Sequence, residues 1–202
     1  MTFIPTTRHL DHIFETEQRF CQLYSLPIQR LDKIHWSPLT VIWKAVKFLA
    51  EEKDARILDI GSGAGKFCLA GAHYKPFAKF YGAEQRQYLV QESQSAREKL
   101  GMIHVEFEHK NFTQIDLKEF SGFYFYNSFF ENLPGSDKID DSIEYSLELF
   151  YYYTRYLYKK LEEMPAGTKV ATYCSWNDEI PPCYQIAEAH NDNLLKFWVK
   201  KM

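Results

Sequence analysis

The sequence has few cysteines, and they do not have the spacing of a metal site. Cys21, Cys68, Cys174 and Cys183 are scattered along the 202 residues, and no C-x-x-C pair occurs. A disulfide framework or a cysteine-based zinc site is therefore not expected. Cys68 and Cys174 lie in apolar segments and are typical of small core residues.

Long hydrophobic runs and a strong charge of one sign are also missing. No run approaches the roughly 18 apolar residues of a transmembrane helix, and residues 1–12 lack the apolar stretch of a secretory signal peptide. The net charge is −3 and the pI about 6.2, whereas general nucleic-acid binders usually carry a basic surface. We expect a cytoplasmic protein with no membrane contact, no metal and no general nucleic-acid binding.

What the chain does have is an ordinary globular composition with many aromatic residues. Apolar residues make up 46% and charged residues 25% of the sequence, which is typical of a folded domain. Aromatics account for 17%, including 14 Tyr and 16 Phe. No repeat, low-complexity tract or linker divides the chain. The length and composition therefore predict one domain over residues 1–202.

The most informative stretch is residues 56–67, which read R-I-L-D-I-G-S-G-A-G-K-F. Its apolar beginning predicts a strand that is buried on both faces of a parallel sheet. Gly61, Gly63 and Gly65 follow, and glycines let the backbone turn sharply and let a ligand approach the peptide groups. The apolar helix expected after them presents free N–H groups and the positive end of its dipole. The stretch predicts a small-molecule site at the mouth of a sheet.

Spacing separates three kinds of nucleotide-binding loop. In a P-loop, Ile60 would have to be the first glycine and Phe67 a hydroxyl residue. A dinucleotide fingerprint fits poorly because the third glycine comes one residue early. The remaining pattern, acid-x-Gly-x-Gly-x-Gly from Asp59, resembles the first motif of the class I S-adenosylmethionine-dependent methyltransferases.

This resemblance covers roughly residues 37–202 and implies a fold, a cofactor and an activity. The fold is α/β, with a doubly wound, mostly parallel seven-stranded sheet. The activity is methyl transfer from S-adenosylmethionine to an amino group or another nucleophile. The resemblance assigns five residues of the first motif to cofactor binding: Asp59, Gly61, Ser62, Gly63 and Gly65.

A second acid supports the cofactor assignment. Residues 78–84 predict the next strand, which ends in Glu84 about twenty residues after the glycine loop. A carboxylate at this strand end is placed to accept both hydroxyls of a ribose. Gln85 and Arg86 follow at the position that contacts adenine in the resembled family. As an isolated residue, Glu84 is also compatible with a solvated strand end.

A third strand is predicted over residues 102–109, after a helix over 87–100 that Gly101 ends. In the resembled family, a polar residue and an apolar neighbour after this strand hold the adenine. Asn111 and Phe112 match these two positions in residue type. A solvated turn is the alternative interpretation.

The fourth strand, residues 122–127, leads into Asn127-Ser128-Phe129-Phe130. Its carboxyl end is expected to face the reacting methyl group, because ligands of doubly wound folds bind there. Methyltransferases acting on amino groups often carry Asn/Asp-Pro-Pro-Tyr/Phe at this position, and only Asn127 and Phe130 match. Some protein-lysine methyltransferases of the Dot1 type have an Asn and a Phe here, to which Asn127 and Phe129 are similar.

We therefore assign Asn127 and Phe130 as the catalytic residues, with Asn127 also contacting the cofactor. The substitution of both prolines leaves an alternative open. The chain could instead be a catalytically silent module that binds S-adenosylmethionine or a partner on the same fold.

The remaining segments complete the expected architecture. Residues 1–35 are predicted to form a helical cap, with one amphipathic helix over 11–26, and residues 36–202 the catalytic core. Ser37 is the expected N-cap of the next helix, with Pro38 in its first position.

The C-terminal part is predicted to contain a long helix, a fifth strand and a hairpin. The helix is expected over residues 141–164, the strand over 169–174 and the hairpin over 184–200. Residues 175–183 are too few for a crossover helix, so the last crossover is expected to be abbreviated.

Overall fold

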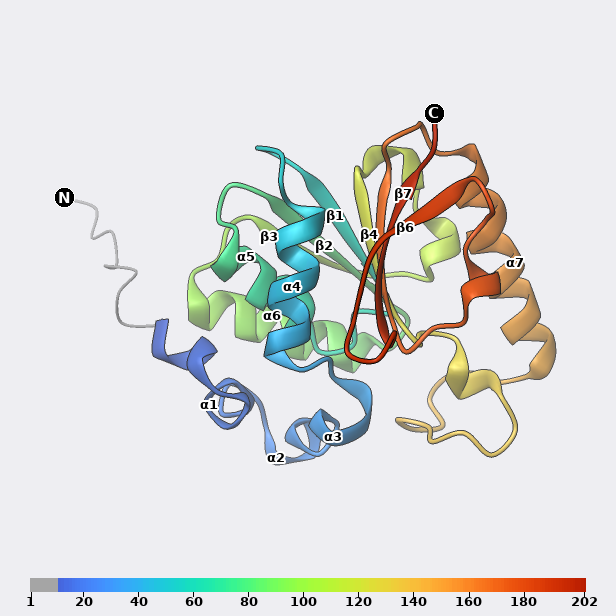
Figure 1. Cartoon of the computed structure of the whole chain (residues 1–202). Helices are drawn as coiled ribbons and strands as arrows, with labels where there is room; N and C mark the ends of the chain where they lie inside the picture. Colours follow the sequence, from blue (N-terminus) through green and yellow to red (C-terminus); the bar gives the residue numbers. More distant parts are fainter. Residues whose placement is uncertain (1–10) are drawn as a thin grey trace.

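The computed structural model describes residues 11–202 and is built around one seven-stranded sheet (Figure 1). The strand order is β3-β2-β1-β4-β5-β7-β6, and β7 alone runs antiparallel to both of its neighbours. The predicted doubly wound, mostly parallel seven-stranded sheet is confirmed. The strands are β1 (Arg56–Ile60), β2 (Lys79–Glu84), β3 (Val105–His109), β4 (Gly122–Tyr126), β5 (Lys169–Tyr173), β6 (Tyr184–His190) and β7 (Leu195–Lys200).

The two faces of the sheet are covered unequally. One face packs against α4 (Leu39–Leu49), α5 (Lys66–Tyr74) and α6 (Gln87–Leu100). The other face packs against a single long helix, α7 (Leu147–Glu163), and against aromatic side chains from short turns. Those turns include the 3₁₀ segments η3 (Phe112–Gln114) and η4 (Leu117–Glu119). On this second face, aromatic rings therefore cover area of the sheet that helices cover on the first face.

Each central strand supplies both cores, which explains why these strands read as unbroken apolar runs. On β4, Tyr124 joins the core under α4 and α5, whereas Phe123 and Phe125 join the core under α7. On β1, Ile57 and Leu58 are divided in the same way. Successive side chains of a strand point to opposite faces, so a strand buried on both sides must be apolar throughout.

The single helix predicted over residues 11–26 is wrong. The structure has four short helices instead: η2 (Asp11–Glu15), α1 (Glu17–Cys21), α2 (Leu26–Gln29) and α3 (Asp32–His35). Thr16 divides the first two because its hydroxyl caps α1, accepting the Arg19 N–H at 3.2 Å. Pro27 lies in the first turn of α2 rather than ending a helix, which its missing N–H permits.

The start of α4 also differs from the prediction. Pro38, not Ser37, is the N-cap residue, and neither supplies a capping side chain. The Leu39 N–H donates instead to the Glu17 carboxylate at 2.6 Å, so a neighbouring helix caps α4. The Ser37 hydroxyl hydrogen-bonds the Tyr124 hydroxyl at 2.6 Å inside the core.

The long helix α7 begins at Leu147 rather than at residue 141. The Ser146 hydroxyl accepts the Leu149 N–H at 3.1 Å and fixes this start. Residues 133–146 therefore form an irregular segment beside the carboxyl ends of the strands (Figure 1). The crossover from β5 to β6 contains only the 3₁₀ turn η6 (Asn177–Glu179), as the short spacing predicts.

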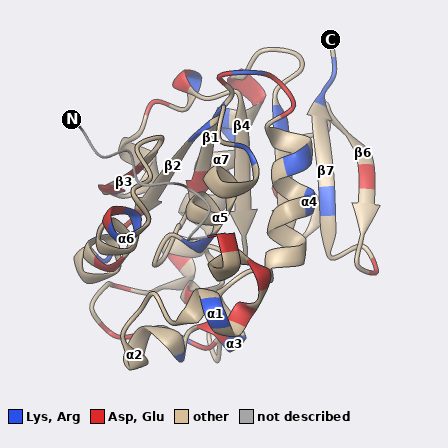
Figure 2. Cartoon of the chain, turned by 90° about the vertical axis from the view of Figure 1, so that its left-hand side faces the viewer, with Lys and Arg blue, Asp and Glu red and all other residues tan. Residues whose placement is uncertain are grey.

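The N-terminal helices dock onto the glycine loop through a buried lysine. Lys66 opens α5 with a side chain only 4% exposed, and its ammonium pairs with Glu17 and with Asp32, the latter at 3.1 Å. The Tyr24 hydroxyl adds a hydrogen bond to the Ala64 carbonyl at 2.8 Å. Figure 2 shows α1, α2 and α3 together below the sheet, with acidic and basic residues mixed along the chain.

We expect Lys66→Met to lower the free energy of unfolding by about 1–3 kcal/mol. Removing one partner of a fully buried ion pair costs roughly 3–5 kcal/mol, and Glu17 and Asp32 are partly exposed, which reduces the loss. Urea denaturation measures it. The control is Lys160→Met, whose surface pair with Glu163 should leave the midpoint unchanged. Equal midpoints for both variants would contradict the docking role of Lys66.

Candidate functional site

The glycine loop between β1 and α5 turns through three residues with positive φ. Gly61, Gly63 and Gly65 have φ of 75°, 54° and 86°. A Cβ on Gly65 would lie 2.5 Å from the Phe107 ring, and one on Gly61 would lie 2.9 Å from Cβ of Ser128. A Cβ on Gly63 would meet no atom within 4 Å. Gly61 and Gly65 are thus required by packing, whereas Gly63 faces open space.

Glu84, at the end of β2, holds this loop in place from the adjacent strand. Its carboxylate accepts the Gly63 N–H at 3.0 Å through one oxygen and the Arg86 N–H at 2.9 Å through the other. Burial raises the pKa of Glu84, and the Arg86 guanidinium and these N–H groups oppose that rise. The carboxylate therefore lies at the loop in a fixed orientation.

A cavity of about 320 Å³ opens beside Gly61, Gly63 and Glu84. This volume is within the range of ligand pockets, roughly 300–1,000 Å³. Residues after β4 form its second side, and the helix α3 forms its third. The lining residues outside the glycine loop and β2 include Ile34, His35, Trp36, Tyr126, Asn127, Ser128, Phe130 and Glu131.

A smaller cavity of about 40 Å³ lies where the adenine is expected, lined by Gln85 and Phe112 among others. This volume is far below the roughly 300–1,000 Å³ of ligand pockets. The Asn111 amide donates to Gln85 at 2.9 Å and to Tyr153 at 2.8 Å, while its oxygen accepts the Thr113 N–H. The side chain of Asn111 is thus fully engaged within the protein.

Asp59 and Ser62 lie outside the residues that line either cavity. Asp59 is buried, and its carboxyl contacts the Cys68 thiol at 3.9 Å. Burial, with a further contribution from Glu84, raises the pKa of Asp59 well above its ordinary value. The Ser62 hydroxyl is buried with no hydrogen-bond partner. Gly65 is likewise absent from the cavity lining.

Asn127 follows β4 in a left-handed conformation, with φ of 51°. Asparagine tolerates this region better than most residues. Its backbone carbonyl accepts the Phe130 N–H at 3.0 Å, and its side-chain oxygen is buried with no hydrogen-bond partner. Asn127 lines the larger cavity. An acceptor without a partner at a cavity wall is suited to a ligand that donates a hydrogen bond.

The two residues that stand where related motifs have prolines fix the loop in other ways. The Ser128 hydroxyl donates to the Ile60 carbonyl and ties the loop after β4 to the strand β1. Phe129 is buried and stacks on Phe112 with 5.2 Å between ring centroids. Phe129 is therefore a core residue, and of these two phenylalanines Phe130 is the one that lines the larger cavity.

The match to known proteins agrees with this arrangement. Residues 51–145 match a family model described as a methyltransferase domain. This match covers a little less than half of the chain. The fold of the chain is that of the class I S-adenosylmethionine-dependent methyltransferases, as predicted from the glycine loop.

Individual relatives are distant or cover short stretches. A tRNA (guanine-N(7)-)-methyltransferase of Synechococcus sp. (strain JA-3-3Ab) is 44% identical over 54 residues, which are 27% of this chain. The match spans about a quarter, 23%, of that relative's own length.

Two solved structures are similar over most of the chain. An RNA methyltransferase from Salinibacter ruber, in complex with S-adenosyl-L-homocysteine, is 16% identical with a TM-score of 0.57, covering 82% of this chain and 94% of its own. Precorrin-6y C5,15-methyltransferase from Geobacter metallireducens GS-15 is 10% identical with a TM-score of 0.58, covering 84% and 92%. At these identities, the similarity shows the fold alone.

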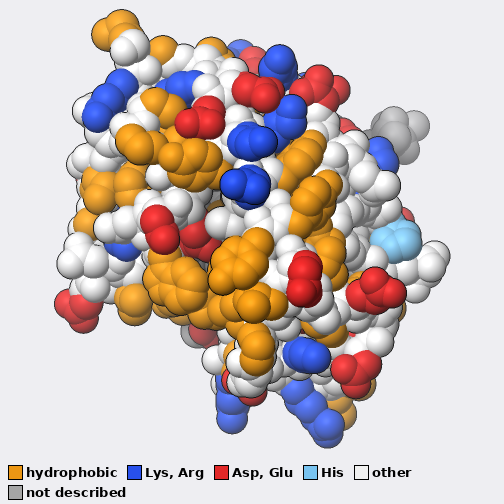
Figure 3. Space-filling view, turned by 90° about the vertical axis from the view of Figure 1, so that its right-hand side faces the viewer, with side chains coloured by type: hydrophobic (Ala, Val, Ile, Leu, Met, Phe, Trp, Pro, Cys, Tyr) orange, Lys and Arg blue, Asp and Glu red, His pale blue; other side chains and the backbone are white. Residues whose placement is uncertain are grey.

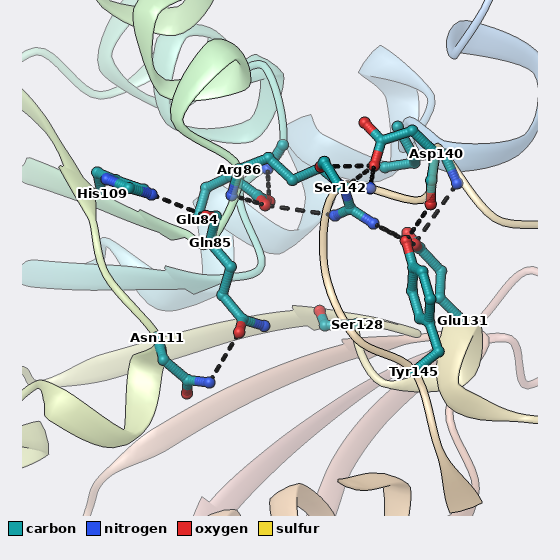
Figure 4. Close-up of polar contacts among 12 residues, drawn as sticks. Glu84, Gln85, Arg86, His109, Asn111, Ser128, Glu131, Asp140, Ser142 and Tyr145 are labelled. Carbon is teal, nitrogen blue, oxygen red and sulfur yellow. Dashed lines mark hydrogen bonds and ion pairs between the residues drawn. The ribbon is translucent and has the colours of Figure 1, made fainter.

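Two charged residues near the larger cavity make contacts that the sequence does not predict. The resemblance puts Arg86 on the adenine side only by its position after Glu84, whereas Figure 4 shows its guanidinium between Glu84 and Glu131. Lys66 follows the glycine loop and had no role once the P-loop interpretation failed. A charged residue inside a buried apolar stretch is the signal that identifies Lys66, since buried charges need partners.

Two kinds of feature are missing from the part of the chain that the structure describes. Within residues 11–202, no helix is long and apolar enough to cross a membrane. The same residues contain no cluster of three or more His, Cys, Asp or Glu side chains able to hold a metal ion.

Aromatic side chains lead from the larger cavity to the surface that carries α7. The Phe130 ring lies 4.9 Å from the Trp176 ring, and the Phe150 ring contacts both Trp176 and Tyr151. Trp176 is 50% exposed and Tyr151 62% exposed. Figure 3 shows hydrophobic side chains gathered on this face of the molecule.

The glycine loop yields a prediction about stability. Gly63→Ala should cost about 1–2 kcal/mol, the usual cost of a left-handed conformation for a residue with a Cβ. Gly65→Ala should cost roughly 1–3 kcal/mol more, because its Cβ also overlaps Phe107. Urea denaturation of both variants measures the difference. Equal losses would show that packing at Gly65 relaxes without cost.

Proposed function

We propose that the protein transfers a methyl group from S-adenosylmethionine to a nucleophilic acceptor. The observation that carries the proposal is the meeting of three residues at one cavity: Gly63 in the glycine loop, Glu84, whose carboxylate accepts the Gly63 N–H, and Asn127, whose buried amide oxygen has no hydrogen-bond partner. Gly63 leaves room for a ligand to approach the peptide groups. The residues present therefore fit a cofactor that combines a ribose with an amino-acid chain.

Under this proposal, the cofactor is held from three sides. Glu84 accepts the ribose hydroxyls, and the loop at Gly61 and Gly63 lies along the methionine part. Gln85 and Phe112 border the adenine, whose cavity of about 40 Å³ must widen on binding. Residues 11–35 act as a cap on the core of residues 36–202 within one domain, because α3 lines the larger cavity.

When bound, S-adenosylmethionine supplies an electrophilic methyl group that a nucleophile displaces directly. Asn127 orients that nucleophile, because its amide oxygen has no other hydrogen-bond partner and accepts a hydrogen bond from an N–H or O–H. Phe130 forms the adjoining wall of the cavity. Alignment of this kind lowers the barrier without a change in ground-state affinity.

The acceptor that fits the surroundings best is an RNA base that approaches along Phe130 and Trp176, because aromatic rings stack well on bases. Two of the similar proteins are RNA or tRNA methyltransferases. The test is to incubate a cell extract with methyl-labelled S-adenosylmethionine and the protein, and to identify the labelled fraction. A silent binding module would bind S-adenosylhomocysteine in calorimetry yet label no RNA, protein or small molecule.

We expect Glu84→Gln to weaken binding of S-adenosylhomocysteine by about 1.5–3 kcal/mol, the range for hydrogen bonds to a charged group. Calorimetry measures the loss, which should shrink with the 2′-deoxy analogue of the ligand. Glu108→Gln is the control, because Glu108 pairs with Lys110 on the neighbouring strand β3. If Glu84→Gln preferred S-adenosylhomocysteine over the 2′-deoxy analogue as strongly as wild type does, Glu84 would not be a ribose-binding residue.

We expect Asn127→Gly to reduce turnover by about two to three orders of magnitude, in the range for a lost positioning group. Glycine is the informative replacement, because φ at this position is 51° and alanine would add strain. Affinity for S-adenosylmethionine should stay within a few-fold of wild type. Normal turnover in a folded Asn127→Gly protein would refute the catalytic assignment.

A further inference from the structure

Arg86 joins three separate segments at the edge of the proposed cofactor site (Figure 4). Its guanidinium pairs with Glu84 at 3.3 Å and with Asp140 at 3.3 Å, and it also pairs with Glu131. The same group donates to the Tyr145 hydroxyl at 2.6 Å. Glu84 ends β2, Glu131 lies in η5 (Phe130–Asn132), and Asp140 and Tyr145 belong to the irregular segment before α7.

The side chain of Arg86 is only 5% exposed, so it is a buried cation. Burial alone would lower its pKa, but Glu84 and Glu131 more than offset this effect and raise it. The guanidinium is therefore permanently charged. A planar guanidinium with several donors can hold more than one carboxylate in a fixed orientation, which an ammonium does less well.

We propose that Arg86 is a positioning residue for cofactor binding: it holds the Glu84 carboxylate charged and correctly oriented, and it fastens residues 131–145 beside the adenosine. This inference rests on the proposed function, in which Glu84 accepts the ribose hydroxyls. Arg86 acts through Glu84 and need not touch the ligand itself.

The orientation of Glu84 follows from its contacts. One oxygen accepts the Gly63 N–H, and the other accepts the Arg86 N–H and guanidinium. Each carboxylate oxygen has two lone pairs, so Arg86 occupies both on the second oxygen, while one stays available for a ribose hydroxyl on the oxygen that accepts the Gly63 N–H. Without Arg86, the second oxygen keeps only the backbone N–H, and the carboxylate is free to rotate.

The charge of Glu84 depends on its neighbours in every adjacent element. Asp59 on β1, Glu131 on η5 and Tyr88 on α6 all interact with it electrostatically. At the end of β3, His109 bonds the Gln85 carbonyl, and Lys110, which follows the strand, is paired with Glu108, so neither compensates Glu84. Arg86 is thus the cation that keeps the carboxylate ionised.

The sign of the pH effect follows from this arrangement. Burial already raises the pKa of Glu84, and Arg86 opposes that rise. Removing Arg86 raises the pKa further, so Glu84 takes up a proton at a higher pH than in the wild type. Because the ionised carboxylate is a better hydrogen-bond acceptor for a ribose hydroxyl than the protonated form, ligand affinity in the variant should fall as pH is lowered.

The test compares Arg86→Met with Arg56→Met by calorimetry with S-adenosylhomocysteine at pH 8.0 and pH 6.0. Arg56 is a matched control: it also pairs with a glutamate, Glu119, and a tyrosine hydroxyl, Tyr81, at the opposite end of the sheet. We expect Arg56→Met to follow wild type. Arg86→Met should lose about tenfold in affinity at pH 8.0 and clearly more at pH 6.0.

Two further measurements separate positioning from a purely structural role. Arg86→Met should also lose the preference for S-adenosylhomocysteine over its 2′-deoxy analogue. Arg86→Lys keeps the positive charge but not the planar guanidinium, so it should recover the wild-type pH dependence more fully than the wild-type affinity. His35 also lines the cavity, and burial lowers its pKa, so its titration contributes to the pH dependence of every variant. Dividing the affinity of each variant by that of wild type at the same pH cancels this contribution.

The outcomes are distinguishable. If the wild type binds no S-adenosylhomocysteine, the proposed function itself fails. If the wild type binds and Arg86→Met matches it, or loses the same factor at both pH values with its ribose preference intact, only the role of Arg86 is overturned. If Arg86→Met does not fold, Arg86→Lys decides by the same two criteria.

Discussion

The carboxylate of Glu84 is the contact on which the geometry of the site depends. It joins the end of β2 to the glycine loop through the Gly63 N–H, and it does so while buried. A buried carboxylate must be paired or neutralised. That need explains why an arginine follows two residues later in the chain, where its own N–H and its guanidinium both reach the carboxylate.

Two buried cations flank the glycine loop and tie irregular segments to the sheet. Lys66 holds α1 and α3 on one side through Glu17 and Asp32, and Arg86 holds residues 131–145 on the other. Neither segment contributes a strand or a long helix, so hydrogen-bond ladders do not order it. Ion pairs centred on these two buried cations provide directional contacts that apolar packing lacks.

The sequence predicted the parts of the structure that depend on local patterns. The glycine loop, the strand ending in Glu84 and the helix stopped by Gly101 lie where expected, because backbone conformation and burial periodicity determine them. The single N-terminal helix was wrong, since capping by Thr16 outweighed the apolar spacing. The role of Arg86 depends on contacts across 45 to 59 residues, which no local pattern contains.

The motif after β4, Asn127-Ser128-Phe129-Phe130, must hold the backbone rigid near the proposed ligand, as the glycine loop does. In the resembled motif, prolines limit the loop conformation; here the Ser128 hydroxyl bonds the Ile60 carbonyl and Phe129 stacks on Phe112. Gly61 is required because Ser128 approaches it so closely. The two loops therefore immobilise each other, and Asn127 is held in a left-handed conformation between them. Since strain of this kind persists only where the surroundings impose it, the replacement of the prolines is compatible with a rigid site and does not by itself argue for lost chemistry.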